Sequence, residues 1–382
     1  MAARIGDEIQ NPDSLDSHDK TPQPVVMEAS TAEPQECRES DQDWESRGKL
    51  IHDYLEKNSP QFVKVRDLRK KGWENPAGDT FFQNQRRIAE NPDERTTMIF
   101  FDMMKRIGQE MQKITSALKV KTPRWGKTQI LDMGMAPGGF LATAMNLNPG
   151  AQAMGFSLPE SDGGHRVIIS HSLDIDRRDV DITMLAADMG VKDIPADHPD
   201  FAKFLPRQFT PDQRFDLVIC GGTKVNKQER ASYRHEREPQ RLGASQLALG
   251  LERLRPGGTM VVLFHKMEAW GTVRELYRFS QFSELKAFKP MSGHNKRSSF
   301  YMIVTRVQSK SSLALQAIQR WKDIWQAATF GSEEDFHETR RKNSPDVKEV
   351  LDEFGDQLVK KGNRVWQIQA QALEKAPFVQ SK

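Results

Sequence analysis

One stretch of the sequence decides the fold: Leu131-Asp132-Met133-Gly134-Met135-Ala136-Pro137-Gly138-Gly139-Phe140. It joins an apolar run typical of a strand, Gln129–Met133, to an apolar run typical of a helix, Phe140–Met145. Glycines at such a junction let a ligand approach the backbone closely, and the first turn of the helix offers free N–H groups. We therefore expect a ligand-binding turn at the edge of a sheet.

The spacing of these glycines separates the turn from two common nucleotide-binding motifs. Gly134 is followed by Gly138 and Gly139, which is not the G-x-G-x-x-G spacing of a dinucleotide-binding turn. No Gly-Lys-Ser or Gly-Lys-Thr follows, so the turn is not a P-loop. Neither motif explains the stretch.

The surrounding sequence alternates between strand-like and helix-like segments. Six apolar runs predict buried strands: Gln129–Met133, Ala151–Phe156, Ile182–Ala187, Phe215–Cys220, Thr259–Phe264 and Phe300–Thr305. Amphipathic helices are expected over 236–255 and 271–284. Strands separated by helices indicate an α/β fold, with a mostly parallel sheet and helices on both of its faces.

Helical patterns flank this region on both sides. Apolar residues recur every three or four positions between 84 and 118, and the chain is helix-like again after 309. The first residues are acidic and polar with few large apolar side chains, so we expect them to be disordered. The predicted parts are a tail (1–42), an N-terminal helical extension (43–127), the α/β domain (128–308) and a C-terminal helical extension (309–382).

The composition narrows the class of protein. The 382 residues have a net charge of +3, which by itself does not indicate a nucleic-acid-binding protein. The two cysteines, Cys37 and Cys220, form neither a metal-ligand spacing nor a disulfide framework, so no metal site is expected. The sequence has no apolar run long enough for a membrane helix and no secretory signal pattern. These features predict an intracellular protein of the cytoplasm or nucleus with no membrane partner, and they do not determine its oligomeric state.

The glycine-rich stretch resembles the first motif of the FtsJ-like methyltransferases, L-D-hydrophobic-G-x-A-P-G-G-F/W, a family that includes ribosomal RNA 2′-O-methyltransferases. The resemblance continues through Phe215–Cys220, Gln246–Leu247, Arg255–Thr259, Lys289–Pro290 and Arg297–Tyr301, and it covers about 128–307. It implies a Rossmann-like methyltransferase fold of seven strands, with the last strand antiparallel. It also implies S-adenosylmethionine as the cofactor.

The resemblance places this cofactor outside the carboxyl ends of the strands. Ser157 stands where an acidic residue after the second strand usually binds the ribose hydroxyls, and Glu160 is an alternative in the same loop. Asp188 stands where an acidic residue after the third strand usually contacts the adenine. The cofactor-binding residues predicted in this way are Asp132, Gly134, Ala136, Pro137, Gly138, Gly139, Phe140, Ser157, Asp188 and Cys220.

The RNA ribose methyltransferases of this family use a catalytic lysine–aspartate–lysine–glutamate tetrad, and this chain departs from it. Gly221, Leu263 and Ser299 stand where the aspartate, the second lysine and the glutamate would be. The residues nearest to the first lysine are Asp102 and Lys105. Three of the four positions therefore lack the side chain that ribose methylation would need.

Other polar residues near these positions are candidates for catalysis. His265 follows Leu263 by two residues, so on a strand it lies on the same face, and histidine titrates near neutral pH. A packing role at the end of the strand is an equal alternative for His265. The predicted catalytic residues are His265, Lys266 and Lys105.

Three functions fit these observations. The protein is an RNA ribose 2′-O-methyltransferase, a methyltransferase acting on a small-molecule acceptor, or a catalytically inactive protein that binds the cofactor or a partner. The basic stretch between Lys224 and Arg241 would suit RNA phosphates. Glutamates interrupt it, however, which favours a solvated, mixed-charge surface. RNA and a small molecule are therefore both candidate acceptors.

Overall fold

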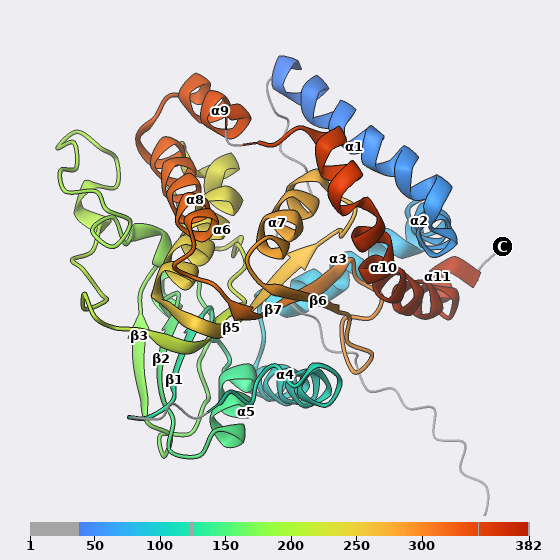
Figure 1. The fold of residues 1–382 in the computed structure, drawn as a ribbon. Coiled ribbons are helices and arrows are strands. Elements are labelled where there is room, and N and C mark those ends of the chain that lie inside the picture. The colour runs from blue at the N-terminus through green and yellow to red at the C-terminus, as the bar shows by residue number, and fades with distance from the viewer. Residues whose placement is uncertain (1–37, 122–125, 343, 381–382) are drawn as a thin grey trace, which may run out of the picture.

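The computed structural model describes residues 38–121, 126–342 and 344–380, and within them a sheet of seven strands runs through the molecule (Figure 1). The strands are β1 (Gln129–Met133), β2 (Gln152–Ser157), β3 (Ile175–Asp179), β4 (Phe215–Cys220), β5 (Leu254–His265), β6 (Glu284–Phe288) and β7 (Ser299–Val307). Helices cover both faces of the sheet, as the alternating sequence pattern predicts.

The strands are arranged in the order β3-β2-β1-β4-β5-β7-β6. β1 pairs in parallel with β2 and β4, whereas β7 runs antiparallel to β5 and β6. The chain leaves β1 in one direction and returns at β4 on its other side, and open α/β sheets bind ligands at such a switch point. The Rossmann-like prediction of a mostly parallel sheet with an antiparallel last strand is confirmed.

The helices fall into three groups along the chain. The N-terminal extension contains α1 (Arg38–Asn58), α2 (Pro60–Trp73), α3 (Pro76–Glu90) and α4 (Glu94–Thr115). The α/β domain contains α5 (Gly139–Leu147), α6 (Arg234–Arg253) and α7 (Trp270–Ser280). The C-terminal extension contains α8 (Ser312–Phe330), α9 (Glu333–Lys342), α10 (Val347–Glu374) and α11 (Pro377–Gln380). None of the helices in the described ranges is long and apolar enough to cross a membrane.

Both extensions are helical, as predicted, but one boundary differs. The first helix begins at Arg38 rather than at residue 43. The rest of the predicted disordered tail, residues 1–37, lies outside the described residues.

The predicted third strand is wrong. Its first residues, 182–184, form a short 3-10 turn, and the strand in this part of the sheet is β3. β3 lies at the edge of the sheet and exposes most of its side chains, which is compatible with its polar sequence, Ile-Asp-Arg-Arg-Asp. An edge strand of this kind lacks the apolar run of a buried strand. The apolar run Ile182–Ala187 is instead buried as a loop against α6.

Two apolar cores lie on the two faces of the sheet. Leu131 and Met133 on one face of β1 belong to the core that includes α6, α7 and α8. Ile130 on the other face belongs to the core that includes α4 and α5. Strand residues alternate between the faces, so the apolar run of a central strand supplies both cores.

The two extensions pack against each other beside β6 (Figure 1). The ring of Phe62 in α2 meets Trp366 in α10 edge to face, with 5.3 Å between the ring centroids. The hydroxyl of Ser59 donates a hydrogen bond to Asn363 Oδ1 (2.6 Å) and accepts one from the Phe62 N–H (3.0 Å), which caps α2. Helices α1–α3 and α10–α11 of the two extensions therefore form one structural unit.

A buried carboxylate joins this unit to the α/β domain. Glu268, in the loop after β5, is only 4% exposed. It accepts hydrogen bonds from Arg69 of α2 and from the Trp366 indole N–H (3.2 Å). Burial acts to raise the pKa of Glu268, but the charge of Arg69 and the hydrogen bonds outweigh burial, so the pKa is lowered and the carboxylate stays ionised.

We expect Glu268→Gln to lower the free energy of unfolding by about 3 kcal/mol at pH 7, because it leaves the Arg69 charge buried without its partner. The folded pKa of Glu268 is below its unfolded value, so its contribution is complete above that value and is lost as the pH falls through the folded pKa. The difference in the free energy of unfolding between Glu268→Gln and the parent protein should therefore shrink at acidic pH. Urea unfolding followed by circular dichroism measures it.

The control is Glu374→Gln, which removes a half-exposed ion pair with Lys64 (2.8 Å) between the same two extensions. It should cost less than about 1 kcal/mol. Equal losses in the two variants would contradict the role assigned to Glu268.

Candidate functional site

A cavity lies outside the carboxyl ends of β1, β2 and β4, and we call it the main cavity. Its empty volume is about 1050 Å³, including the part open to solvent. Gly134, Ala136 and Pro137 of the glycine-rich turn form one wall, and Gly221 and Gly222 after β4 form another. Helix α4 of the N-terminal extension also contributes to the wall, so this extension is part of the site.

Two glycines of the glycine-rich turn, Gly134 and Gly138, have backbone conformations that favour glycine. Gly134 has φ +119, a region that favours glycine, and a Cβ there would lie 2.3 Å from the Gly222 nitrogen. Gly138 has φ +114 and is the N-cap of α5, with no side chain capping the first turn of the helix. The N–H groups of that turn are therefore free of side-chain caps, and a helix N-terminus of this kind favours anionic ligand groups.

A second, more enclosed cavity lies between the sheet and α4, and we call it the inner cavity. Its empty volume is about 520 Å³, including the part open to solvent. It shares Met104, Gly134 and Gly221 with the main cavity, so the two cavities meet at these residues. Its remaining lining is mostly apolar and consists of Leu118, Asp132, Met135, Phe140, Ile219, Cys220, Val261, Leu263 and Tyr301.

Asp132 is the carboxyl group in the wall of the inner cavity. It is 1% exposed, and burial raises its pKa to about 8, so the group is mostly protonated at pH 7. Its Oδ1 atom has no hydrogen-bond partner among the described residues. Buried polar atoms are nearly always hydrogen-bonded, so an atom of this kind beside a cavity indicates a place for a polar ligand group or water.

Comparisons with known proteins identify the family of this chain. A sequence model of the family described as FtsJ-like methyltransferase matches residues 105–307, which is more than half of the chain. The chain belongs to the FtsJ-like methyltransferase family. S-adenosylmethionine, the cofactor implied by this family, is therefore the methyl donor, as the sequence resemblance predicts.

Several solved methyltransferase structures are similar to this chain. An O-methyltransferase family protein from Burkholderia thailandensis is 15% identical over 65% of this chain and 72% of its own, with a TM-score of 0.31. An rRNA methylase from Streptococcus thermophilus is 12% identical over 55% and 95%, with a TM-score of 0.30. Human N-acetylserotonin methyltransferase, solved with its cofactor, is 14% identical over 65% and 66%, with a TM-score of 0.31. The curated proteins contain no match. Similarity at this level does not identify an acceptor.

Most of the predicted cofactor-binding residues lie at the two cavities of this methyltransferase. Gly134, Ala136, Pro137 and Ser157 line the main cavity. Asp132, Phe140 and Cys220 line the inner cavity, together with Gly134. Gly138 and Gly139 form the uncapped N-terminus of α5 beside Pro137. The turn, the uncapped helix end and the unpartnered Asp132 oxygen together fit the amino-acid part of S-adenosylmethionine, which has an ammonium and a carboxylate group.

Asp188 does not stand after the third strand as predicted, because that strand is β3. Its carboxylate accepts hydrogen bonds from the backbone N–H groups of Gln208 (2.8 Å) and Phe209 (3.2 Å), and Asp188 lines neither cavity. The acidic residue that follows β3 is Asp181, which lines the main cavity. The sequence reasoning missed Asp181 because it placed the strand seven residues too late. The polar run before Asp181 is the signal of an edge strand that would have identified it.

The three predicted catalytic residues lie outside the linings of both cavities. His265 pairs with Ser299 across β5 and β7, at the end of β5. The Lys266 backbone N–H donates to the carbonyl of Ser298 (3.1 Å). Lys105 lies on α4 beside Asp102, at 3.8 Å. Their catalytic role stays a prediction that the cavities do not support.

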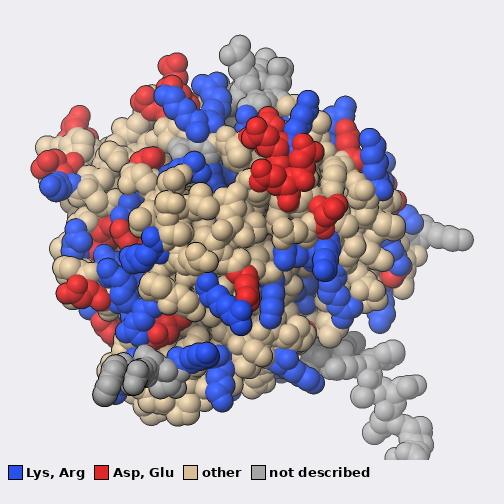
Figure 2. Space-filling model, in the orientation of Figure 1, with Lys and Arg blue, Asp and Glu red and all other residues tan. Residues whose placement is uncertain are grey.

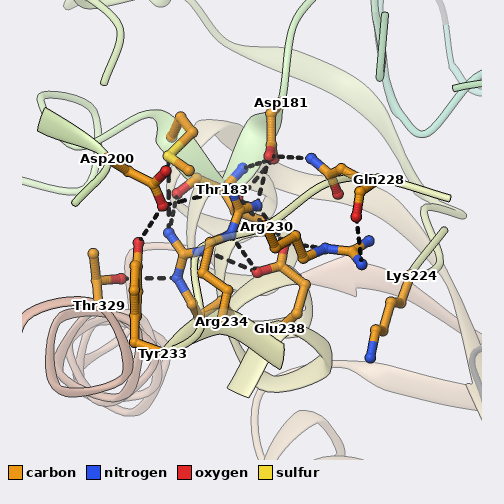
Figure 3. Close-up of polar contacts among 12 residues, drawn as sticks. Asp181, Thr183, Asp200, Lys224, Gln228, Arg230, Tyr233, Arg234, Glu238 and Thr329 are labelled. Carbon is orange, nitrogen blue, oxygen red and sulfur yellow. Dashed lines mark hydrogen bonds and ion pairs between the residues drawn. The ribbon is translucent and has the colours of Figure 1, made fainter. Parts of the chain in front are cut away.

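A buried ionic network borders the main cavity (Figure 3). Arg234 at the start of α6 is 1% exposed and donates to Asp181 (2.7 Å) and to both oxygens of Glu238 (2.7 and 2.9 Å). Arg241, one helical turn beyond Glu238, donates to Glu238 (2.8 Å) and to Thr329 of α8 (3.0 Å). The network therefore connects the C-terminal extension to the residue that follows β3.

The network also keeps Asp181 charged. Burial acts to raise the pKa of Asp181, but the charge of Arg234 and the hydrogen bonds from Arg234 and Thr183 outweigh burial and lower the pKa. The carboxylate is therefore ionised at neutral pH and acts only as a hydrogen-bond acceptor.

We expect Gly134→Ala to weaken S-adenosylmethionine binding by roughly tenfold or more, because the new Cβ would push the ends of β1 and β4 apart. Gly150→Ala is the matched control, since Gly150 also has a positive φ (+78) but its Cβ would meet no atom within 4 Å. Calorimetric titration measures the two dissociation constants. Equal affinities for the two variants would contradict the assignment of the turn to the cofactor.

Asp132 should make the ligand-free protein less stable as the pH rises. Its folded pKa of about 8 is above its usual 3.8, so between these values the folded state binds more protons than the unfolded state. Stability should therefore fall by up to ~1.4 kcal/mol per pH unit in this range. Urea unfolding at several pH values should show a flatter profile for Asp132→Asn. Parallel profiles for the parent and this variant would show that Asp132 does not titrate in this way.

Proposed function

We propose that the protein transfers the methyl group of S-adenosylmethionine to a small, largely uncharged acceptor molecule. The observation behind this proposal is the inner cavity, which meets the main cavity at Gly134, Gly221 and Met104. In this proposal the cofactor binds in the main cavity. The acceptor approaches from the side of the inner cavity, between the sheet and α4.

Three features of the chain's own residues support the cofactor part of the proposal. The turn at Gly134 lets a ligand lie against the backbone, and the N-terminus of α5 favours a carboxylate. The Asp132 oxygen without a partner offers an acceptor for an ammonium group. S-adenosylmethionine supplies an electrophilic methyl group on a sulfonium sulfur.

The lining of the inner cavity supports the acceptor part. Leu263 and Gly221 stand where the resemblance would place a lysine and an aspartate, and both line this cavity. A Cβ on Gly221 would have the Gly134 carbonyl oxygen, at 3.9 Å, as its nearest atom, so this glycine leaves open space. Phe140 and Tyr301 supply aromatic walls, with 5.4 Å between their ring centroids. An apolar cavity of this kind favours an uncharged, compact acceptor.

The chemistry asked of the protein is mainly positioning. Methyl transfer requires the acceptor atom and the methyl group to be held in line, and a rigid cavity supplies that orientation. Burial raises the pKa of the Tyr301 hydroxyl, and the carboxyl group of Asp132 is mostly protonated at pH 7. The Tyr301 hydroxyl can therefore orient a small acceptor by hydrogen bonding without bringing a charge into the cavity, whereas Asp132 is left to the ammonium group of the cofactor.

RNA is the competing acceptor, and two arginines of the basic stretch that suggested it have a different role. Arg234 and Arg241 are 1% and 0% exposed and are paired with Glu238, so they do not face phosphates. On the face shown in Figure 2, acidic side chains lie among the basic ones, and an acidic cluster is visible.

Methyl transfer from labelled S-adenosylmethionine tests the proposal directly. Purified protein is incubated with total RNA in one arm and with an extract of small molecules in the other. We expect label in the small-molecule arm. Label in RNA would establish the ribose or base of RNA as the acceptor and overturn the proposal. Cofactor binding without transfer in either arm would leave only a binding function.

Leu263→Lys is expected to reduce methyl transfer to the small acceptor by more than tenfold while changing cofactor affinity by less than about threefold. The reason is that Leu263 lines the inner cavity but not the main one, and a buried ammonium group would exclude an uncharged acceptor. Leu263→Met is the control, since it keeps the volume and the apolar character. The comparison uses transfer rates at saturating cofactor together with calorimetric affinities. Full transfer by Leu263→Lys would remove the inner cavity from the mechanism.

A further inference from the structure

The carboxylate of Asp181 has no acceptor position left for a ligand. Its Oδ1 accepts from the Thr183 N–H (2.9 Å) and hydroxyl (2.7 Å). Its Oδ2 accepts from the Gln228 amide (2.8 Å) and from Arg234 (2.7 Å). An ionised carboxylate has about four lone-pair positions, and all four are used. Asp181 lines the main cavity, yet it already has the partners that it can hold.

The neighbour that Asp181 orients is Gln228. Because the ionised carboxylate only accepts hydrogen bonds, the NH₂ group of the Gln228 amide must face it, and the amide oxygen must face the other way. The amide oxygen has no hydrogen bond to any part of the chain that the structure describes (Figure 3). Gln228 lines the main cavity and is half-buried. It therefore presents a fixed, unused acceptor at this cavity.

The loop that holds Gln228 is anchored at several points. This loop joins β4 to α6. Arg230 donates to the backbone carbonyls of Gln228 (3.3 Å) and Val225. The Asn226 amide donates to Glu90 of α3 (2.7 Å), which ties the loop to the N-terminal extension. The Gln228 amide oxygen is thus positioned before any ligand binds, and preorganisation of this kind favours affinity.

We propose that the Gln228 amide oxygen accepts a hydrogen bond from the adenosine part of S-adenosylmethionine, and that Asp181 and Arg234 are positioning residues for it. This inference rests on the proposed function. If the methyl group lies where the two cavities meet, beside Gly221, the rest of the cofactor extends through the main cavity toward the ends of β2 and β3. Gln228 lies at that end, paired with the residue that follows β3.

The chemistry of the contact limits its partner to an N–H or O–H donor. In the adenosine part these donors are the 6-amino group of the base and the two ribose hydroxyls. Either the amino group or a ribose hydroxyl would be a neutral hydrogen-bond donor to the Gln228 amide oxygen. Two ligand analogues distinguish between these donors. S-inosylhomocysteine replaces the amino group by oxygen, and the 2′,3′-dideoxy analogue of S-adenosylhomocysteine lacks both hydroxyls.

The experiment measures calorimetric dissociation constants of S-adenosylhomocysteine and of the two analogues. The parent protein should bind S-adenosylhomocysteine more tightly than both analogues. Gln228→Ala should weaken S-adenosylhomocysteine binding about 3- to 10-fold, the value of one hydrogen bond. Gln228→Ala should leave the affinity unchanged for the analogue that lacks the donor bound by Gln228. We call this the informative analogue, because it identifies the donor. Equal losses for all three ligands would overturn the direct contact, because they would indicate only a damaged loop.

Two further variants separate contact from positioning. Asn226→Ala is the matched control in the same loop, since it removes the anchor to Glu90 but no group that lines the main cavity, and it should preserve the preference among the three ligands. Asp181→Asn is nearly isosteric but no longer requires the Gln228 NH₂ group to face it. It should reduce the preference for S-adenosylhomocysteine over the informative analogue, and an unchanged preference would overturn the positioning role of Asp181. Melting temperatures without ligand report whether each variant folds.

The outcomes also separate this inference from the proposed function. Failure of the parent protein to bind S-adenosylhomocysteine would overturn both. Binding by the parent with no change of preference in Gln228→Ala would overturn only the inference.

Discussion

The architecture of the site depends on a close approach between two stretches of backbone, at the ends of β1 and β4. The Gly222 N–H donates to the carbonyl of Met133 (3.0 Å), and the side chain of Gln246 holds both the N–H (2.9 Å) and the carbonyl (3.0 Å) of Gly222. The distance between Gly134 and Gly222 leaves no space for a Cβ on Gly134. The main and inner cavities meet beside this contact. The two cavities can therefore meet only because β1 and β4 are each followed by glycine at the same level of the sheet.

The central part of the fold could be predicted from sequence because its strands are buried on both faces. Such strands form mostly apolar runs, and the predicted ranges of β1 and β4 match the structure residue for residue. β3 does not, because it lies at the edge and exposes Asp176 and Arg177. The position of Asp188 was wrong for the same reason, since a mislocated strand displaces every residue that is counted from its end. The family resemblance located the glycine turn correctly because that motif is local.

What could not be predicted depends on contacts between distant parts of the chain. The spacing of Arg234, Glu238 and Arg241 is visible in the sequence and suits ion pairs within a helix. Whether such pairs face solvent or the interior depends on α8, which begins about 70 residues later and covers them through Thr329. The same holds for the pairing of Asp181 with Gln228. A sequence read segment by segment indicates charge at these positions, but it does not indicate burial.

The packing of α2 on α10 has a consequence for how the chain is made. Ser59 and its partner Asn363 are 304 positions apart. At a synthesis rate of roughly 5–20 residues per second, about 15 to 60 s separate their appearance at the ribosome. During that time Phe62 and the rest of the apolar face of α2 have no α10 to cover them. The apolar face of α2 therefore cannot reach its final environment until α10 has been synthesised.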